Sequence, residues 1–414
     1  MKNIVKVATL LSLSAATLLA SGYRIPEQSL NSVALSAAYV AGANGADASY
    51  YNPANMVFME NGAFTEVALT YINLPKVTFE GIAPVMNGDS KEEQFLMPNL
   101  HYVSPMVGNW RYGLSITAPA GLSKRWDEPF SKASAEEFTL KVIEVNPTAS
   151  YKFNDQFSVG FGLRGVYTDG IVSSDANGLG SNVSRNLTGD SIDFGYNLAL
   201  SYKPIQDLTL AATYRSKVDL TVSGNATLVH PVATYNNIGA SVTIPLPASL
   251  VLATSYTIDK TTVELVFERT YWSSYKDLDF NYDTALSLVG GAASPYEAFD
   301  AARPKNWKDV NAYRIGISHQ YSDTLKLMAG FAIDKTPAPS NTLGFELPDS
   351  DAKLYSVGFE YKLSQNMKMG LAYLYDDKES RTVSNNTGGT SVAPSGTFSN
   401  SAAHLVTASL KYKF

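Results

Sequence analysis

The sequence predicts an all-β membrane protein, an antiparallel transmembrane β-barrel of about fourteen strands with a small helical N-terminal hatch inside its lumen. Three observations lead to this prediction. Strand-length segments alternate apolar and polar residues, short turns alternate with long loops, and 25 Tyr, 18 Phe and 29 Gly accompany only 17% charged residues. The mean hydropathy of −0.08 fits this class, because lipid-facing apolar and lumen-facing polar residues cancel in the average.

The segment 207–222 shows the alternation most clearly. Its apolar positions are predicted to face lipid and its polar positions to face the lumen. The lipid-facing set is Leu208, Leu210, Ala212, Tyr214, Val218, Leu220 and Val222, and the lumen-facing set is Thr209, Thr213, Arg215, Lys217, Asp219 and Thr221. Segments 156–167, 324–334 and 366–375 repeat the pattern. Such length favours tilted membrane strands over the alternative, a secreted β-protein.

The candidate strands number about fourteen, an even number, as expected for a single-chain bacterial barrel. They are predicted at 63–74, 94–104, 110–119, 138–153, 156–170, 189–203, 207–223, 247–257, 261–277, 308–321, 324–336, 352–363, 366–382 and 402–414. The intervening turns are alternately short and long. The long loops, predicted to lie outside the cell, are 75–93, 120–137, 171–188, 224–246, 278–307, 337–351 and 383–401. Both chain ends are then expected in the periplasm.

The first residues predict export. Lys2 and Lys6 flank the start of a 14-residue apolar stretch at 7–20, which indicates a secretory signal peptide over residues 1–20. The chain contains no cysteine, which is consistent with a bacterial envelope protein that needs no disulfides. The formal charge of −6, about −8 without the leader, argues against nucleic-acid partners.

The chain ends on an alternating strand, "SLKYKF". Leu410, Tyr412 and Phe414 fall on one face, and the last residue is aromatic. This ending resembles the signal that outer-membrane barrels present to the barrel insertion machinery. We therefore expect an integral protein of the Gram-negative outer membrane.

Residues 21–61 do not alternate and are predicted to form the hatch. The segment is small, weakly charged and interrupted by Gly42 and Gly45, which suits short helices and turns. It could form a separate periplasmic helix, but fourteen strands enclose a lumen too wide for side chains alone to fill, which favours a plug. Asn52 is a suitable N-cap and Pro53 a suitable first helical residue for a short helix through Met56.

The hatch segment also resembles a known family. "SGYRIPEQSLNSVALSAAYVAGANGADASYYNPANM" is similar to the N-terminal hatch of FadL/TodX-type outer-membrane transporters of long-chain fatty acids and hydrophobic hydrocarbons. The family's Asn-Pro-Ala matches Asn52, Pro53 and Ala54, and its Glu-Gln-Ser matches residues 27–29. "ITAPAGLSKRW", "VNPTASYKFNDQFSVGFGL", "TYRSKVDLTVSG" and "RTYWSSYKDL" resemble later family segments in the same order.

The resemblance implies a fourteen-stranded barrel whose substrates enter from the outer loops, bind in the lumen and leave sideways through a kink in the third strand. "WRYGLSITAPAGL" offers a physical basis for a kink between Gly113 and Gly121, because Pro119 removes a ladder donor and Gly113 has no side chain to pack. A hatch helix at 52–54 is expected to pack near this break. The alternative is that Asn52-Pro53 simply turns the chain into the first strand.

A hydrophobic acid would need an apolar tunnel and a cation. Arg164, Arg215 and Lys217 are predicted to point into the lumen, where each either meets a substrate carboxylate or pairs with an acid such as Glu264, Glu268 or Asp219. The apolar part of the tunnel is predicted at Tyr23, Ile25, Leu30 and Tyr39. On the outer loops, Leu122, Trp126 and Phe130 would form a loose capture groove, or pack the loops together or face lipopolysaccharide.

Nothing in the sequence indicates catalysis, a metal site or a cofactor. The four histidines, His101, His230, His319 and His404, lie far apart, with no Ser/His pair or metal-ligand spacing. The predicted function is passive uptake of hydrophobic small molecules by a monomer that contacts outer-membrane lipid and lipopolysaccharide. A porin for polar solutes, and an adhesin or phage receptor on the same scaffold, are the alternatives.

Overall fold

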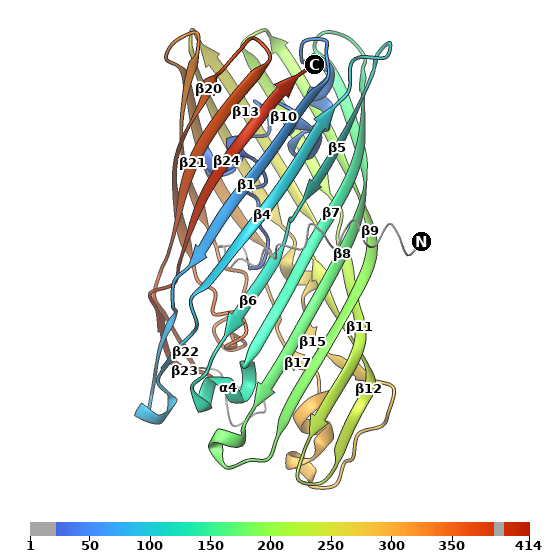
Figure 1. Cartoon of the computed structure of the whole chain (residues 1–414), viewed down its shortest axis with the longest axis vertical. Helices are drawn as coiled ribbons and strands as arrows, with labels where there is room; N and C mark the ends of the chain where they lie inside the picture. Colours follow the sequence, from blue (N-terminus) through green and yellow to red (C-terminus); the bar gives the residue numbers. More distant parts are fainter. Residues whose placement is uncertain (1–21, 385–392) are drawn as a thin grey trace.

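The computed structural model describes residues 22–384 and 393–414, and the predicted signal peptide at 1–20 lies outside them. Within the described residues the strands form one closed antiparallel barrel, drawn with its long axis vertical in Figure 1. Closure is made by the first and last strands, which pair from Phe64↔Lys413 to Asn73↔His404. The predicted fold class, an all-β barrel of fourteen strands, is confirmed.

The barrel wall consists of fourteen strands, three of which are divided into two segments; we call two of these strand three (β5 and β6) and strand seven (β10 and β11). In chain order the wall elements are β1 (Phe64–Leu74), β4 (Glu93–Val103), β5 (Trp110–Thr117), β6 (Gly121–Arg125), β7 (Glu137–Lys152), β8 (Phe157–Asp175), β9 (Ser184–Ile205), β10 (Leu208–Arg215), β11 (Val218–Val229), β12 (Thr234–Leu246) continuing into β13 (Ser249–Ile258), β14 (Thr261–Thr270), β18 (Val310–Gln320), β19 (Leu325–Asp334), β20 (Ala352–Lys362), β21 (Met367–Lys378) and β24 (Ala402–Lys413).

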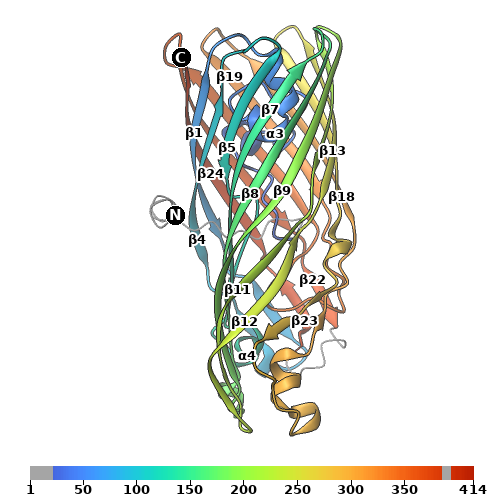
Figure 2. The same cartoon turned by 90° about the vertical axis from the view of Figure 1, so that its right-hand side faces the viewer.

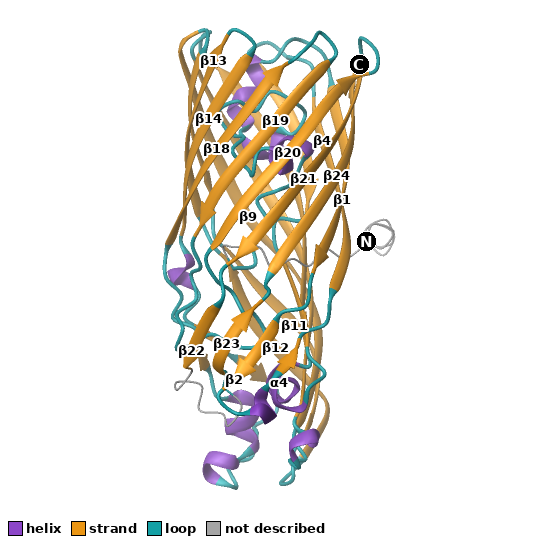
Figure 3. Ribbon diagram, turned by 90° about the vertical axis from the view of Figure 1, so that its left-hand side faces the viewer, coloured by secondary structure: helices purple, strands orange, loops and turns teal. Residues whose placement is uncertain are grey.

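The remaining elements lie inside the barrel or at its outer end. Inside are α2 (Leu30–Ala34), α3 (Ala48–Tyr51) and the 3₁₀-helix η2 (Pro53–Phe58). At the outer end, low in Figure 3, are β2 (Thr78–Gly81), η3 (Pro84–Met86), β3 (Gly88–Asp89), α4 (Pro129–Ala135), η4 (Asn177–Leu179), η5 (Trp272–Ser274), β15 (Asp277–Leu278), β16 (Phe280–Tyr282), η6 (Gly291–Ala293), η7 (Tyr296–Asp300), β17 (Arg303–Pro304), β22 (Arg381–Ser384) and β23 (Ser395–Ser399). No helix in the described part of the chain has the length and apolar character needed to cross a bilayer.

The outward face carries the apolar band that the alternation predicts. On β9, Ile192, Phe194 and Tyr196 are 65, 78 and 47% exposed on one side, whereas Asn197 and Ala199 are buried in the lumen. Because lipid rather than water surrounds this face, such exposure is favourable. An aromatic chain at the end with the short turns joins Trp110 to Tyr151 at 4.9 Å between ring centroids, as expected of an interfacial girdle.

Two predictions about strand and loop boundaries are wrong. The predicted outer loop 224–246 is largely strand, because β11 and β12 pair from Val218↔Leu246 to Val229↔Thr234 and carry the wall beyond the membrane. The predicted loop 120–137 likewise contains β6 and α4. These extensions are as rich in polar residues as loops are, but backbone pairing with neighbouring strands decides their conformation.

Strand seven also does not keep one face along its length. Leu210 and Tyr214 face outward on β10 as predicted, but Val218 and Leu220 on β11 are buried inside. The ladder with β9 changes register by one residue across the interruption, from Arg215↔Asn197 to Ser223↔Asp190. Such an extra residue reverses which alternate residues face lipid, so the predicted single face over 207–222 is wrong.

The N-terminal segment 23–58 fills the lumen near the short-turn end (Figure 2). One acidic side chain holds its middle: Glu264 of β14 accepts hydrogen bonds from the backbone N–H groups of Val40, Ala41 and Gly42 at 2.5–2.9 Å. Gly42 is required there, since a Cβ would lie 2.6 Å from the Glu264 carboxylate. A buried carboxylate with several backbone donors is satisfied without a cation.

Arg111 of β5 fixes the end of this segment to the wall. Its buried guanidinium donates five hydrogen bonds to main-chain carbonyls, those of Met56, Met59, Glu60, Gly62 and Ser104, at 2.7–3.1 Å. One side chain thus joins η2, the start of β1 and the turn after β4. Removing it would leave several buried carbonyls without a donor.

We predict that Arg111→Ala lowers the free energy of unfolding in detergent by about 2–4 kcal/mol, because charged donors to buried carbonyls are worth more than neutral ones. Denaturant titration followed by tryptophan fluorescence measures this. Arg269→Ala, which breaks a half-exposed ion pair with Asp309, is the matched control and should cost less than about 1 kcal/mol. Equal losses in the two variants would contradict the anchoring role.

Candidate functional site

The wall is interrupted beside strand three. β4 pairs with β5 only from Leu100↔Ile116 to Val103↔Gly113, while β6 pairs with β7 and not with β4. Residues 93–99 of β4 therefore have, within the described chain, no strand partner on this side. Pro119 lies in the interruption and has no N–H to donate, which is the local reason why the ladder stops.

The N-terminal segment supplies the missing hydrogen bonds. Ile25 N–H donates to the Pro119 carbonyl at 2.9 Å, and Gly121 N–H donates to the Tyr23 carbonyl at 2.9 Å. The Gln28 amide accepts from Ala118 N–H and donates to the Ala118 carbonyl, both at 2.8 Å. Residues 23–28 thus lie along the interruption as a short extra strand and side-chain clamp.

The outer end of the gap is held by separate contacts. Lys91 N–H donates to the Arg125 carbonyl at 2.8 Å, and the Arg125 guanidinium forms a bidentate pair with Glu93 at 2.6 and 2.7 Å. The wall is therefore joined on both sides of the interruption. Between them, segment 23–28 is the element that lies against strand three.

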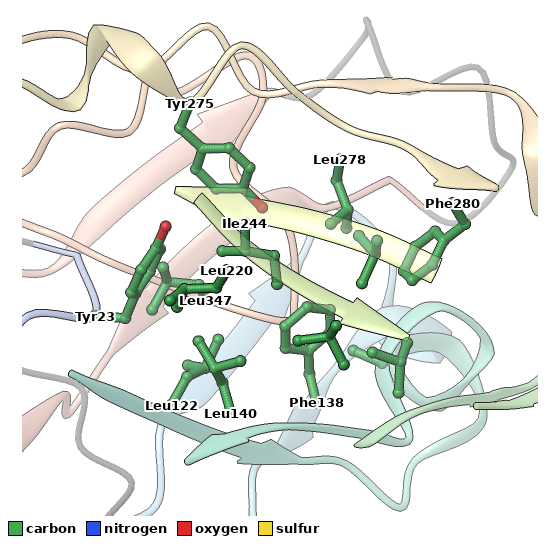
Figure 4. Close-up of a cluster of buried hydrophobic side chains, with 14 of the residues drawn as sticks. Tyr23, Leu122, Phe138, Leu140, Leu220, Ile244, Tyr275, Leu278, Phe280 and Leu347 are labelled. Atoms are coloured by element: carbon green, nitrogen blue, oxygen red, sulfur yellow. The ribbon is translucent and has the colours of Figure 1, made fainter. Parts of the chain in front are cut away.

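On the outer side of this segment lies an aromatic cluster that includes residues of the outer loops. Tyr23 contacts Trp272 and Trp307 at 4.7 and 5.8 Å between ring centroids, and its hydroxyl donates to the Pro245 carbonyl at 2.6 Å. Figure 4 shows Tyr23, Leu122 and Tyr275 converging on the same buried space. A small cavity of about 20 Å³ remains among them. The cluster gives the segment an apolar anchor on the outer side.

A larger groove of about 140 Å³ lies between the outer elements. Aromatic and apolar side chains line it together with three basic residues and one acid; the lining includes Phe138, Leu278, Phe280, Phe299, Phe345, Arg185, Arg303, Lys305 and Glu346. The Arg185 guanidinium lies 4.3 Å from the Phe280 ring, whereas Lys305 pairs with Glu346. Apolar side chains beside an excess of basic ones suit a molecule with an apolar body and an anionic head.

Two of the predicted lumen cations lie together. Arg164 pairs with Glu144 at 2.8 Å, and Arg215 pairs with the same carboxylate while its guanidinium lies 4.4 Å from the Tyr50 ring. Arg215 also borders a cavity of about 50 Å³ between the N-terminal segment and strands β10, β13 and β14. Two cations sharing one carboxylate leave a net positive charge beside this cavity. Both arginines thus pair with an acid, as the alternative expected, but the acid is Glu144 and not Glu264, Glu268 or Asp219.

The third predicted cation, Lys217, does not face the lumen. It lies outside, exposed, and pairs with Asp219 at 2.8 Å. The change of register at the interruption of strand seven turns it outward. The lumen carries another ionic network instead, in which Glu268 pairs with Arg24 at 2.7 Å and with Arg314 at 3.2 Å.

The Asn-Pro-Ala residues lie away from the gap. The Asn52 amide donates to Ser201 of β9 at 2.8 Å, and the Ala54 carbonyl accepts from Ser158 of β8 at 2.7 Å. Pro53 begins a helix as predicted, but the Asn52 side chain makes no capping bond. The expected packing of this helix beside the break is therefore wrong. Gly113, also predicted at the break, is paired on both sides, and a Cβ there would meet Met56 of the helix at 2.7 Å.

The apolar candidates are buried, except for the partly buried Phe130, and are spread over several places. Trp126 donates to the Phe345 carbonyl at 2.9 Å, and Phe130 packs on Phe345, so these loop residues hold the loops together. Leu122 lines the small outer cavity with Tyr23. In the hatch, Leu30 fills the space over Gly370, and Tyr39 borders a cavity of about 540 Å³ at the short-turn end.

Sequence reasoning missed several residues of the gap. The Gln28 side-chain amide binds the backbone of Ala118, and Arg24 forms a β-bridge with Ala120. The match of residues 27–29 to the family's Glu-Gln-Ser did not predict either contact. Trp272 and Trp307, which hold Tyr23, lie more than two hundred residues away in sequence. The signal that could have found them is the clustering of aromatics near the outer end of the predicted strand 261–277 and in the loop after it.

Glu27 is a further buried group of the N-terminal segment. Its carboxylate is buried, and neither oxygen forms a hydrogen bond with another described residue. Burial raises the pKa of Glu27 from 4.5 to about 7, against the attraction of Arg314 and with repulsion from Asp376. Folding therefore favours the protonated form.

We predict that the folded barrel loses up to roughly 3 kcal/mol of stability through Glu27 as the pH rises from about 4.5 to beyond 7, because the folded pKa lies above the unfolded one. Glu27→Gln should flatten this dependence, as measured by denaturant unfolding at pH 5 and pH 8. The exposed Glu379→Gln is the control. An unchanged pH dependence in Glu27→Gln would contradict the assignment.

Known proteins resemble this chain in sequence and in architecture. A family model described as "Outer membrane protein transport protein (OMPP1/FadL/TodX)" matches residues 11–414. The long-chain fatty acid transport protein of Escherichia coli K12 is 24% identical over 369 residues, covering 78% of this chain and 80% of that one. Among solved structures, a Pseudomonas aeruginosa FadL homologue (TM-score 0.82, 18% identity, 95% and 100% of the two chains) and the Ralstonia pickettii toluene transporter TbuX (TM-score 0.70, 18%, 93% and 98%) share the fold. The chain belongs to the OMPP1/FadL/TodX family of outer membrane transport proteins.

Proposed function

We propose that this protein passively takes up hydrophobic small molecules, long-chain fatty acids or aromatic hydrocarbons, and releases them sideways through the gap beside strand three. The observation that carries the proposal is the interrupted wall, where residues 23–28 of the N-terminal segment supply the hydrogen bonds that β4 does not. As a member of a transporter family it is an outer-membrane protein and not an enzyme. A sideways exit suits apolar cargo, because the molecule passes directly into lipid without crossing water.

The route begins at the outer groove. An apolar molecule would first bind among Phe138, Phe280 and Phe345 and then reach the aromatic cluster around Tyr23. Tyr23 and Ile25 belong to the segment that closes the gap, so cargo that displaces Tyr23 acts directly on the closing element. This connection between the aromatic cluster and the gap supports coupling of cargo binding to opening.

We infer that residues 21–61 act as a hatch and that residues 62–414 form the barrel around it. The anchors of this segment differ in kind along its length. Its far end is fixed by Arg111 and its middle by Glu264. Residues 23–28 are bound to strand three by hydrogen bonds worth about 1 kcal/mol net each, and to other elements by the Arg24–Glu268 ion pair and the aromatic packing of Tyr23. Opening therefore needs cargo to replace the contacts of 23–28, and removal of the whole hatch is not required.

The identity of the cargo is inferred mainly from relatives of this chain. One relative is named for long-chain fatty acids and a structural neighbour for toluene. In this chain the basic rim of the outer groove and the Arg164/Arg215 pair favour an acid over a neutral hydrocarbon. Monomeric state, contact with lipopolysaccharide, and recognition of Phe414 by the insertion machinery stay predictions.

Whole-cell uptake tests the function. The full chain would be expressed in a Gram-negative host lacking its own transporter and supplied with labelled oleate, toluene or a small sugar. Uptake of oleate that falls in Arg215→Gln supports an acid transporter, and uptake of toluene alone supports a hydrocarbon transporter. Entry of the sugar without either apolar molecule would contradict the proposal and favour the porin alternative.

The exit has its own test. Pro119→Val restores a backbone donor and a strand-forming residue at the gap, so we predict that uptake falls at least fivefold while the barrel still folds. Folding is checked by the heat-dependent gel mobility of the barrel. Pro147→Val, in the neighbouring β7, is the control and should leave uptake near the wild-type rate. Unchanged uptake in Pro119→Val would argue against a lateral exit at strand three.

A further inference from the structure

The barrel wall has a second interruption, between β9 and strand seven. β9 pairs with β10 from Ile205 to Asn197 and with β11 from Asp190 to Ser184, and the ladder is missing between these two stretches. We call the stretch where residues 191–196 of β9 face residues 216–222 of strand seven the seam. On their other sides both partners stay fully paired, β9 with β8 and β11 with β12. The break is therefore confined to this one junction.

The seam is closed by few contacts. At its inner end Ser216 N–H donates to the Tyr196 carbonyl at 2.9 Å, and Tyr196 N–H donates to the Ser216 hydroxyl at 2.9 Å. Within it, Thr221 N–H donates to the Asp193 carboxylate at 3.3 Å, a side-chain bond in place of a ladder bond. In a bilayer, backbone outside a regular ladder is tolerated where it lines a cavity or a passage.

The β9 edge of the seam contains Gly195, which contributes no side chain. A Cβ on Gly195 would lie 2.7 Å from the Val218 side chain and 2.8 Å from the Ser216 hydroxyl. The seam is therefore closed at that level by side chains of strand seven packed on the glycine, with no ladder beneath them. Immediately behind them, Arg164 donates to the Ser216 carbonyl at 2.6 Å and pairs with Glu144, which also holds Arg215. The lumen cavity bordered by Arg215 is thus one residue away from the seam.

The two lips of the seam differ in polarity. On the β9 side, Ile192 and Phe194 are 65 and 78% exposed and face lipid. On the β11 side, the outward residues are Lys217, Asp219 and Thr221. An apolar lip beside a polar lip matches a molecule with an apolar chain and a charged head, and the two arginines behind the seam favour a negative head.

We propose that the seam between β9 and β11 is a second lateral opening of the barrel, through which single-chain amphiphiles with a carboxylate head exchange between the lumen and the outer leaflet. It lies across β7, β8 and β9 from the gap of strand three. The hatch segment 23–28 closes that gap but does not pair with the seam, so the two openings respond to different contacts. Only the identity of the cargo rests on the proposed function.

Cysteine chemistry tests the opening itself, because the natural chain contains no cysteine. Val218→Cys places a thiol behind the seam, and Ala211→Cys places one on the lumen side of the fully paired β10; both native side chains are at least nine-tenths buried. With the protein in lipid vesicles, a lipid-dissolved pyrene maleimide should label Val218→Cys at least tenfold faster than Ala211→Cys. Equal rates, whether fast or slow, would overturn the proposal.

An engineered disulfide across the seam, called the seam staple, is a second test of the opening. Ile192→Cys with Thr221→Cys lies across the seam in the register of the β9–β11 ladder, and both native residues face outward. Leu200→Cys with Ala212→Cys, a directly paired position of the same two strands, is the matched control. The oxidised seam staple should slow labelling of Val218→Cys to the rate of Ala211→Cys, and reductant should restore it. Labelling that persists through the oxidised staple would also overturn the proposal.

Uptake then separates the opening from the cargo. With labelled oleate, the oxidised seam staple should lower the uptake that remains in the Pro119→Val background at least twofold, reversibly, while the oxidised control staple should not. If Val218→Cys labels fast but no variant, nor the wild type, takes up oleate or toluene, the opening stands and the proposed function fails. If the wild type takes up oleate and the oxidised seam staple leaves uptake unchanged in both the wild-type and Pro119→Val backgrounds, the seam carries no cargo and the proposal fails.

Discussion

The structure depends on the requirement that backbone hydrogen bonds in a bilayer be satisfied within the protein. In a closed barrel every strand has a neighbour on both sides, so each backbone N–H and C=O of the wall can be paired. Where a strand ladder is interrupted, another group has to supply the missing donor or acceptor. At strand three, Pro119 removes a donor and the N-terminal segment supplies the partners through Ile25 and Gln28. The N-terminal segment is thus part of the wall at this place as well as a filling of the lumen.

The same requirement explains how the hatch is bound. Short helices and turns cannot satisfy all their own polar groups, and in the lumen charged side chains of the wall do so. Glu264 accepts from three successive backbone N–H groups, and Arg111 donates to five carbonyls. These charges are buried, so losing either partner leaves a group unsatisfied. Residues 23–28 are held differently, by hydrogen bonds to strand three, the Arg24–Glu268 ion pair and the aromatic packing of Tyr23.

Strand seven illustrates how a single extra residue changes the outcome of an alternating pattern. The sequence alternates without a visible break from 207 to 222, yet the register with β9 shifts by one and β11 presents Val218 and Leu220 to the interior. Lys217 and Asp219 consequently face outward and pair with each other. Val218 and Leu220 thereby join the apolar cluster inside the outer part of the barrel, and the outward side of β11 is polar.

The sequence by itself determined the fold class, the number of strands, the alternation of short turns and long loops, and the proline at the interruption of strand three. These features follow from local physics: a period of two, proline without a donor, and glycine-rich turns. The tertiary structure alone decided the partners of Arg164 and Arg215, the outward turn of Lys217, and the position of Asn52–Ala54 away from the gap. It also decided that residues 23–28 close strand three. Many of these contacts join residues that lie far apart in the sequence. The shear and register of the strands around the closed barrel decide which residues meet, and no local sequence pattern encodes them.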